Sequence, residues 1–379
     1  MSVLPTNVAA KIQSKHGELV VESAPYTHPG PGQVVVRNHA VAINPLDWII
    51  QVEGNLLYGW LKYPAVLGTD VAGEVVELGE GVTRFSVGDR VFALAVGTDK
   101  DTNTGSEGAF QQYTVVRERL ASRVPDGMSF EEASVLPMAV STAAAGLFQD
   151  DYLGLQRPSA EARPTGKTVL VWGGSTSVGS NAIQLAVAAG YEVITTASPK
   201  NFDYVTSLGA SQVFDYNSPT VIPDIITALA DRTVAGAVSF GTTGAPACVK
   251  IMAKARGKKF VAIATPPVDF ASLADPARGR LERARVTIRL IAANIALQFS
   301  ARPHGVGLKY IFGTDIKKNT VSTAIFRDFL PDALADGSYT ATPKPTVVGH
   351  TVGDFQHAMD LQRAGVSATK LVVSLDQVS

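Results

Sequence analysis

Hydrophobic and polar positions follow two different patterns along the chain. In residues 32–42 and 73–91, Val-rich runs are interrupted by Gly, Asp and Pro, which is typical of short strands joined by turns. Between residues 166 and 313, short apolar runs such as 169–171 and 192–196 alternate with helical segments such as 181–189. This alternation predicts βαβ units on a parallel sheet.

The last part of the chain returns to the first pattern. After residue 320, residues 324–335 have a helical pattern, and a β-like tail follows with Pro343, Pro345 and an apolar run over 370–375. We expect this tail to rejoin the β-rich first domain.

Composition limits the classes of function. The 379 residues are enough for two domains, and 46% hydrophobic with 18% charged residues is typical of a globular protein. The net charge is -1 without a dense Lys/Arg run, so we expect no nucleic-acid partner. Apolar runs are too short to cross a membrane, and residues 1–11 lack a secretory pattern, so a cytoplasmic location is expected. Cys248 is the only cysteine, which excludes an internal disulfide.

Residues 168–190 contain the strongest motif: an apolar strand, a glycine turn and an Ala-rich helix. Such a turn brings backbone N–H groups and a helix N-terminus to a pyrophosphate. Gly174 and Gly179 take the first and third glycine positions of a dinucleotide-binding turn, whereas Thr176 replaces the middle glycine. Ser175, Ser177 and Val178 complete the predicted phosphate contacts. The alternative is an ordinary tight turn between a strand and a helix.

The end of the next strand predicts which dinucleotide binds. Ser198, Lys200 and Asn201 stand where NAD-binding folds place an acidic residue on the ribose. A hydroxyl and an ammonium would bind a 2′-phosphate that a carboxylate would repel. The sequence therefore favours NADPH, the alternative being a polar loop with a solvated lysine.

Several blocks, in this order along nearly the full chain, resemble the zinc-independent quinone and enoyl reductase branch of the medium-chain dehydrogenase/reductase superfamily. They are Asn44-Pro45-Leu46-Asp47, residues 64–73 (PAVLGTDVAG), 85–91 (FSVGDRV), 108–115 (GAFQQYTV) and Leu208-Gly209-Ala210. Within that branch, residues 198–203 and the glycine turn are most similar to fungal trans-acting enoyl reductases. The resemblance implies an α/β protein with a discontinuous GroES-like β-barrel domain, residues 1–140 and 321–379, and a doubly wound Rossmann domain, residues 141–320. It implies an active site in the cleft between them.

Zinc alcohol dehydrogenases of the same superfamily bind their catalytic metal through Cys and His. Here Asn44, Pro45, Thr69 and Met138 occupy the corresponding blocks, and residues 98–107 contain no cysteine. Because thiolate and imidazole ligands are missing, we expect no zinc site.

Without a metal, conjugate reduction is the natural chemistry, with hydride passing to an enone or enoyl thioester and hydrogen-bond donors holding the enolate oxygen. The resemblance makes Asn44 and Thr142 candidate donors and cofactor contacts, although Asn44 could instead cap a turn and Thr142 a helix. Asp47 is also a predicted cofactor contact, and we expect it to order its loop. Tyr58 and Lys62 are candidate proton donors, or else ordinary surface or packing residues.

Four further residues are predicted cofactor contacts. The resemblance brings Tyr216 beside the 2′-phosphate, and places Ile263, Ala264 and Phe312 near the nicotinamide. The alternatives are a surface aromatic for Tyr216 and simple core packing for the other three.

Two other functions remain open from the sequence. The first is a quinone or carbonyl reductase that uses the same cofactor, and the second is a regulatory protein that binds NADPH without turnover. The expected partners are a small molecule with an activated alkene or a quinone, together with a polyketide synthase, and the protein is expected to be a monomer or a homodimer without a membrane partner.

Overall fold

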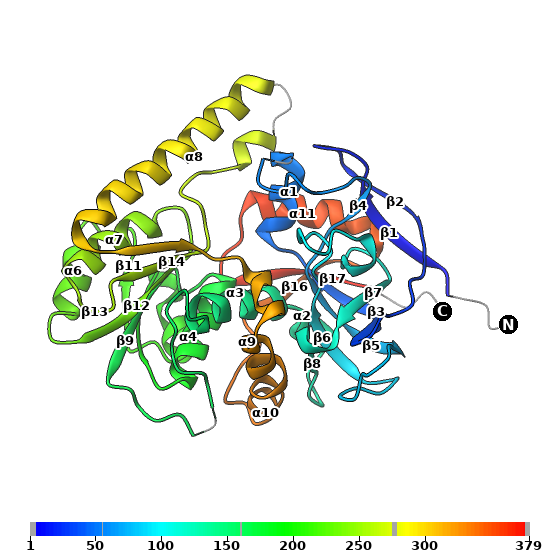
Figure 1. Ribbon diagram of the computed structural model, residues 1–379, viewed down its shortest axis with the longest axis horizontal. Coiled ribbons are helices and arrows are strands. Elements are labelled where there is room, and N and C mark those ends of the chain that lie inside the picture. The colour runs from blue at the N-terminus through cyan, green and yellow to red at the C-terminus, as the bar shows by residue number, and fades with distance from the viewer. Residues whose placement is uncertain (1–4, 55, 160, 275–278, 376–379) are drawn as a thin grey trace. The chain divides into compact units, whose positions relative to one another are not determined.

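The computed structural model describes residues 5–54, 56–159, 161–274 and 279–375. The chain divides into two compact units, residues 1–138 with 326–379 and residues 139–325 (Figure 1). Each unit contains its own large sheet. Within the described residues, no helix is both long and apolar enough to span a bilayer.

The unit of residues 139–325 is built on a parallel sheet in the order β11-β10-β9-β12-β14-β15, and the short strand β13 also pairs with β12. This is the order of a doubly wound dinucleotide-binding fold, as the sequence predicted. The strands are β9 (Lys167–Trp172), β10 (Glu192–Ala197), β11 (Gln212–Asp215), β12 (Thr233–Ser239), β13 (Arg256–Gly257), β14 (Phe260–Ile263) and β15 (Gly307–Tyr310).

Helices cover both faces of this sheet. One core cluster joins Leu170 and Ile194 of the sheet to side chains of α6, α7 and α8. Helix α4 also packs on β9 and β10 but contributes nothing to that cluster, which places it on the opposite face. Burial on both faces explains why β9 reads as a continuous apolar run. The helices are α3 (Pro137–Phe148), α4 (Ser177–Ala188), α5 (Phe202–Ser207), α6 (Val221–Ala228), α7 (Gly244–Lys254), α8 (Gly279–Ala301) and α9 (Thr320–Ser322).

The other unit is mainly antiparallel. Its larger sheet has the order β16-β17-β3-β5-β6-β8, with β7 also paired to β3, and its smaller sheet has the order β2-β1-β4. The strands are β1 (Asn7–Ile12), β2 (Leu19–Ala24), β3 (Gln33–Ala42), β4 (Ala65–Val66), β5 (Asp70–Leu78), β6 (Arg90–Leu94), β7 (Tyr113–Arg117), β8 (Ala121–Arg123), β16 (Lys344–Gly349) and β17 (Thr369–Ser374). The helices are α1 (Pro45–Glu53), α2 (Phe130–Ser134), α10 (Leu330–Ala335) and α11 (Phe355–Ala364).

The C-terminal tail rejoins this sheet, as expected. Strand β17 lies between β16 and β3 and pairs with β3 from Ala42 to Ala40. The continuous helix predicted over 324–335 is wrong. The chain there forms a π-helical turn over Thr323–Arg327 and then the separate helix α10, because Pro331 fits the first turn of a new helix and not the interior of a longer one.

Candidate active site

The glycine turn after β9 is fixed to the end of β10. The Gly173 N–H donates to Thr196 Oγ1 (2.9 Å), and the Gly174 N–H donates to the Thr196 carbonyl (2.9 Å). Gly173 has φ +87°, a conformation that glycine adopts without steric cost. The turn is therefore held rigidly against the neighbouring strand.

Two further glycines are required by close contacts. A Cβ at Gly174 would lie 2.2 Å from Thr195 Oγ1, and one at Gly179 would lie 2.1 Å from the Gly173 carbonyl oxygen. Any side chain at Gly179 would push the helix away from the turn. The third-glycine position thus serves close packing of helix against strand.

Thr176 replaces the usual middle glycine because it caps α4. Its φ of -72° needs no glycine, its Oγ1 accepts from the Gly179 N–H (3.0 Å), and the same hydroxyl donates to the Gly173 carbonyl (2.8 Å). Beside it, the buried Ser177 Oγ has no hydrogen-bond partner within the described residues. An unpaired hydroxyl at a helix N-terminus, where N–H groups also lack intrahelical acceptors, is suited to a phosphate oxygen.

The strand registers bring most of the predicted cofactor residues to one edge of the sheet. Trp172 pairs with Ser239, Ala197 with Asp215, and Ile263 with both Ser239 and Tyr310, so these strands end side by side. The glycine turn, residues 198–201, Tyr216, Ala264 and Phe312 all follow those ends. Ligands of open α/β sheets bind outside this edge.

Residues after β10 and β11 form the outer part of the edge. Ser198 precedes a 3-10 turn, Pro199–Asn201, in which the Lys200 side chain is exposed. The buried Asn201 donates from Nδ2 to Ser198 Oγ (3.2 Å), and so holds that hydroxyl in place. Tyr216 is 42% exposed. No carboxylate occurs from Ser198 to Phe202, and Asp203 is the one acidic residue of α5.

The inner part of the edge is more closely packed. Ile263 is buried in the core cluster, Ala264 is half-buried, and Phe312 is exposed. Thr142 lies inside α3, so the alternative that it caps a helix is wrong. A Cβ on Gly313 would lie 2.4 Å from Thr142 Oγ1, and Ser141 Oγ donates to the Gly313 carbonyl. The structure thus brings Thr142 together with the segment after Phe312.

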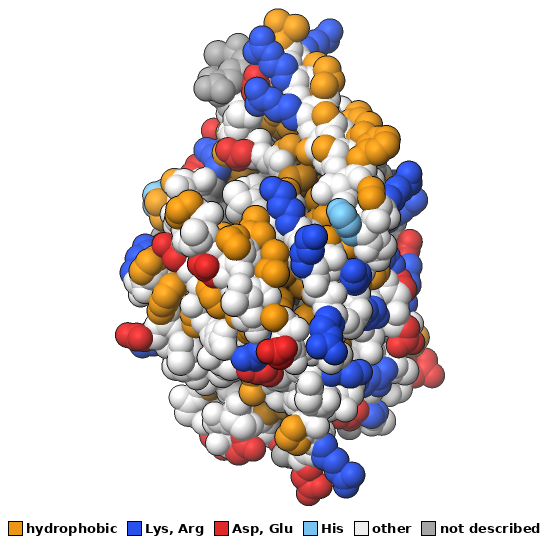
Figure 2. Space-filling model, turned by 90° about the vertical axis from the view of Figure 1, so that its left-hand side faces the viewer, with side chains coloured by type: hydrophobic (Ala, Val, Ile, Leu, Met, Phe, Trp, Pro, Cys, Tyr) orange, Lys and Arg blue, Asp and Glu red, His pale blue; other side chains and the backbone are white. Residues whose placement is uncertain are grey.

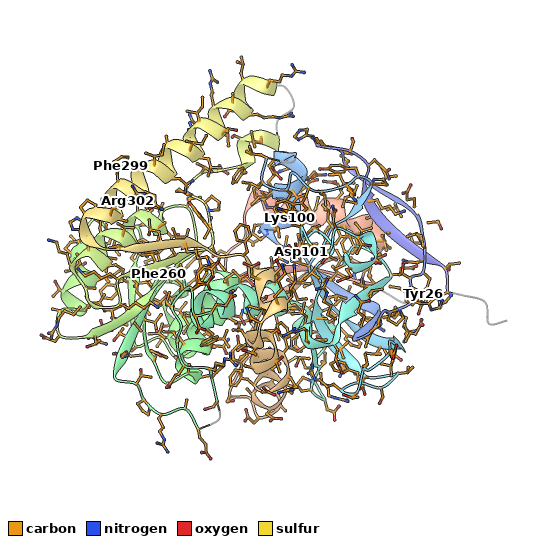
Figure 3. The ribbon with its side chains drawn as sticks, in the orientation of Figure 1. Tyr26, Lys100, Asp101, Phe260, Phe299 and Arg302 are labelled. Carbon is orange, nitrogen blue, oxygen red and sulfur yellow. The ribbon has the colours of Figure 1, made fainter. Side chains whose placement is uncertain are left out.

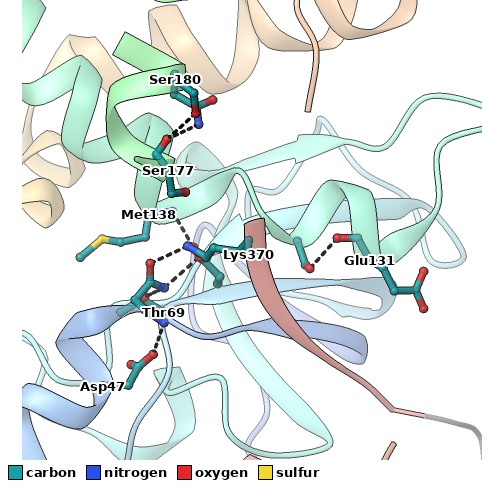
Figure 4. A network of polar contacts seen from close by, with 11 residues as sticks. Asp47, Thr69, Glu131, Met138, Ser177, Ser180 and Lys370 are labelled. Atoms are coloured by element: carbon teal, nitrogen blue, oxygen red, sulfur yellow. Dashed lines mark hydrogen bonds and ion pairs between the residues drawn. The ribbon is translucent and has the colours of Figure 1, made fainter. Parts of the chain in front are cut away.

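In the other unit, Asn44 is part of a buried polar network (Figure 4). Its Nδ2 donates to Thr69 Oγ1 (3.0 Å) and Asp70 Oδ2 (2.8 Å), and its Oδ1 accepts from Lys370 Nζ (2.6 Å). Lys370 also forms an ion pair with Asp70 (2.9 Å), and the Met138 N–H donates to Asp70 Oδ1 (2.5 Å). Both amide hydrogens of Asn44 are therefore already used within the network.

Asn44 is also the N-cap residue of helix α1, whereas the sequence alternative was a residue that caps a turn. Asp47 Oδ2 accepts from the Asn44 N–H (2.7 Å) and orders this loop. Burial raises the pKa of the Asp47 carboxyl, and the neighbouring Asp70 acts in the same direction. The backbone N–H groups of Asn44 and Gly68 and the charge of Lys370 oppose the shift, and the resulting pKa is about 7. Asp47 is thus a buried carboxyl that titrates near neutral pH.

Tyr58 and Lys62 lie in the segment after α1. The Tyr58 ring contacts Trp60 with centroids 5.1 Å apart, and burial raises the pKa of its phenol. Tyr58 therefore remains a proton donor at neutral pH. The Lys62 side chain is exposed, and its backbone N–H donates to Asn103 Oδ1 (3.3 Å).

The donor set around Asn44 does not fit a zinc ion. The carboxylate of Asp70 is paired with the ammonium of Lys370, and the remaining groups are an amide, a hydroxyl and a backbone N–H. Zinc prefers thiolate, imidazole and free carboxylate ligands. Across the described residues, no three His, Cys, Asp or Glu side chains form a group that could hold a metal ion.

Two features of the site were missed by sequence reasoning. Lys370 belongs to the Asn44 network from 326 positions away, so no local pattern reveals it. Residues 240–243 follow β12 at the same sheet edge. An apolar strand followed by Gly241 is a sequence pattern that could have predicted their position at this edge.

Comparison with known proteins now adds to this geometry. Residues 30–126 match the alcohol dehydrogenase GroES-like domain. The dehydrogenase pigH of Monascus ruber is 51% identical over 98% of this chain and 100% of its own length. The chain belongs to the medium-chain dehydrogenase/reductase family. The trans-enoyl reductase himH of Aspergillus japonicus, also similar, is 37% identical over 91% of this chain and 90% of its own.

A solved structure agrees on the fold. The crystal structure of CurK enoyl reductase matches with a TM-score of 0.72 at 19% identity, covering 98% of this chain and 100% of that one. At that identity the likeness concerns the fold. The sequence resemblance to this family, including its oxidoreductase class and its GroES-like and Rossmann architecture, is therefore confirmed.

Proposed function

We propose that this protein reduces an activated carbon–carbon double bond, in an enone or enoyl thioester, with NADPH and without a metal ion. The observation that supports this best is the edge of the parallel sheet where Gly174–Gly179, Ser198, Lys200 and Tyr216 follow neighbouring strand ends. The trans-enoyl reductase among its relatives supports the type of reaction.

In this proposal the glycine turn and the N-terminus of α4 hold the pyrophosphate, with Ser177 Oγ as an added donor. Ser198 and Lys200 bind the 2′-phosphate, while Asn201 orients Ser198. Tyr216 flanks the same phosphate, and Ala264, Phe312 and Thr142 contact the nicotinamide end. The bound nicotinamide supplies hydride to the substrate.

The protein's own groups then control charge and protons. Thr142 Oγ is a hydrogen-bond donor for the enolate oxygen, positioned by contact with Gly313. Asn44 acts as a positioning residue for its loop, since its amide hydrogens bind Thr69 and Asp70. Tyr58, which stays protonated, is a better candidate than the exposed Lys62 for returning a proton to the α-carbon.

The test of the cofactor assignment is Lys200→Glu, with Lys250→Glu on the exposed side of α7 as a matched control. The variant loses the contact between the Lys200 ammonium and the 2′-phosphate, and its new carboxylate repels that phosphate. We therefore expect the Kd for NADPH to rise about tenfold or more. Affinity for NADH should change little in either variant. An unchanged NADPH preference in Lys200→Glu would refute the assignment.

The test of the reaction is NADPH oxidation with an enone, an enoyl thioester and a quinone as acceptors. Consumption with the enone or thioester, and formation of the saturated product, supports the proposal. Turnover restricted to the quinone favours the quinone reductase alternative. If the protein binds NADPH tightly but oxidises it with none of these acceptors, it is a non-catalytic NADPH-binding protein.

A further inference from the structure

Helix α8 has an exposed apolar face opposite the one that packs on its own unit. Val286, Leu297 and Ala301 are buried, the last two in the core cluster with α7. The five large apolar side chains on the opposite side are 52% to 75% exposed: Leu281, Ile288, Ile291, Ile295 and Phe299. Their spacing of three, four and seven places them in one row, which we call the α8 stripe.

The figures agree with this arrangement. Figure 2 shows apolar side chains gathered along the upper part of one surface, with basic side chains beside them. In Figure 3, Phe299 and Arg302 lie at the C-terminal end of α8. A contiguous exposed apolar row of this length is unusual for a surface that only meets water.

Positive charge flanks the stripe, mostly along its first half. At 3.6 residues per turn, Arg280 lies along one side of the row and Arg285 and Arg289 lie along the other, whereas the half-buried Arg283 lies toward the packed face of the helix. The one acidic residue of α8, Glu282, is buried and lies 3.5 Å from Arg285. Residues 290–301 carry no charged side chain, and the exposed Arg302 follows them at the C-terminal end. The stripe is thus flanked by basic side chains, most of them along its first half, and by no exposed carboxylate of α8.

A groove adds shape to this surface. Val286, Arg289, Ala292 and Ala293 of α8, with the segment from Pro267 to Ser272, line a cavity of about 490 Å³ that runs beside the stripe. A flat bilayer would meet the exposed row and leave the groove unfilled, whereas a side chain from another protein could enter it.

A second copy of α8 would not match these charges. In a parallel pair the arginines beside the stripe would face the same arginines of the second copy. In an antiparallel pair they would face residues 290–301, which offer no carboxylate. Either pairing would bury the stripe but leave the arginines without partners.

We propose that the α8 stripe and its groove are a docking surface for an amphipathic helix of another protein, one that carries acidic residues beside its apolar row. Such a helix buries the five apolar side chains, pairs carboxylates with the arginines, and inserts a large side chain into the groove. Its carboxylates lie mainly along residues 280–289, where most of the arginines of α8 stand. Residues 267–272 of the groove follow Ala264 at the proposed NADPH edge, but the docking proposal does not depend on the reaction.

The experiment is selection from a displayed library of helical peptides against the full chain, with counter-selection against Ile288→Ser/Ile295→Ser. We expect enriched peptides to share apolar residues three and four positions apart, with Asp or Glu beside them. The proposal is overturned if the selected peptides bind the wild-type protein and Ile288→Ser/Ile295→Ser equally well, or if they carry no acidic residues.

Direct binding of one enriched peptide then tests both parts of the surface. Arg280→Glu/Arg289→Glu and Ile288→Ser/Ile295→Ser should each raise its Kd at least tenfold, whereas Lys250→Glu/Lys254→Glu on α7 and Val20→Ser/Val87→Ser should not. The Kd for NADPH and the melting temperature report that each variant is folded. Two outcomes would overturn the proposal. If the protein self-associates and Ile288→Ser/Ile295→Ser abolishes this, the stripe binds a second copy. If the protein binds vesicles containing phosphatidylserine and the same variant abolishes this, the stripe binds a lipid surface.

Discussion

Lys370 shows how a single buried charge depends on its partners. Its ammonium pairs with Asp70 and donates to Asn44, and both members of the ion pair are almost fully buried. Removing the ammonium would leave the Asp70 carboxylate uncompensated in the interior. Since breaking a buried ion pair costs about 3–5 kcal/mol, Lys370→Met should lower the free energy of unfolding by that amount, as measured by urea denaturation.

The matched control is the double variant Lys370→Met/Asp70→Asn. It removes both charges, and an asparagine oxygen can still accept from the Met138 N–H. It should therefore lose less stability than Lys370→Met alone. If the double variant is the less stable of the two, the ion pair is not what makes Lys370 important.

Asp47 predicts a pH dependence of stability. Its pKa is about 7 in the folded protein and 3.8 ordinarily, so between these values the folded state retains a proton that the unfolded state has released. Stability from this group is complete below about pH 4 and is lost as the pH rises through 7. Relative to Asp47→Asn, the wild-type free energy of unfolding should fall as the pH rises across this window. A difference that stays constant across the window would contradict the assignment.

At the scale of elements, the turn between β9 and α4 depends on Gly179. An alanine there would place its Cβ 2.1 Å from the Gly173 carbonyl oxygen, in contact with backbone that cannot move without shifting α4. Gly179→Ala should therefore weaken NADPH binding by more than tenfold and lower the melting temperature.

Gly353→Ala is its control, because the new Cβ would lie 3.4 Å from Thr351 Oγ1, an ordinary contact. Calorimetric titration and thermal denaturation measure both effects. Wild-type affinity in Gly179→Ala would show that the phosphates do not depend on this close approach.

The elements also show what the sequence can predict. The β9 strand, the glycine turn and α4 are recognisable because local patterns determine them: an apolar run, a positive-φ glycine and a capping threonine. The break between the turn at 323–327 and α10 was missed, because the helical periodicity continues through it and Pro331 alone marks the new start. The exposed stripe on α8 was also missed, since the same spacing of apolar residues predicts a buried helix face equally well.

At the scale of the whole molecule, the discontinuous unit is where residues far apart in the sequence most often become neighbours in the structure. Lys370 reaches Asn44, and β17 lies between β16 and β3, only because the chain returns after completing a continuous second unit. No residue near Asn44 in the sequence carries this information. Sequence blocks could therefore suggest the fold, but the network that surrounds Asn44 required the structure.

This topology makes the two units unequal in their response to truncation. A chain that ends at Gly337 lacks β16, α11 and β17, so β3 loses one of its paired neighbours and Asp70 loses Lys370. We expect the unit of residues 1–138 to unfold, while residues 139–325 keep their complete parallel sheet and core cluster. Limited proteolysis with mass spectrometry should leave a resistant fragment near residues 139–325 that still binds NADPH. Truncation after Leu375, which keeps every described strand, should leave both units resistant. If the shorter chain instead loses protection everywhere at once, the second unit does not fold independently of the first.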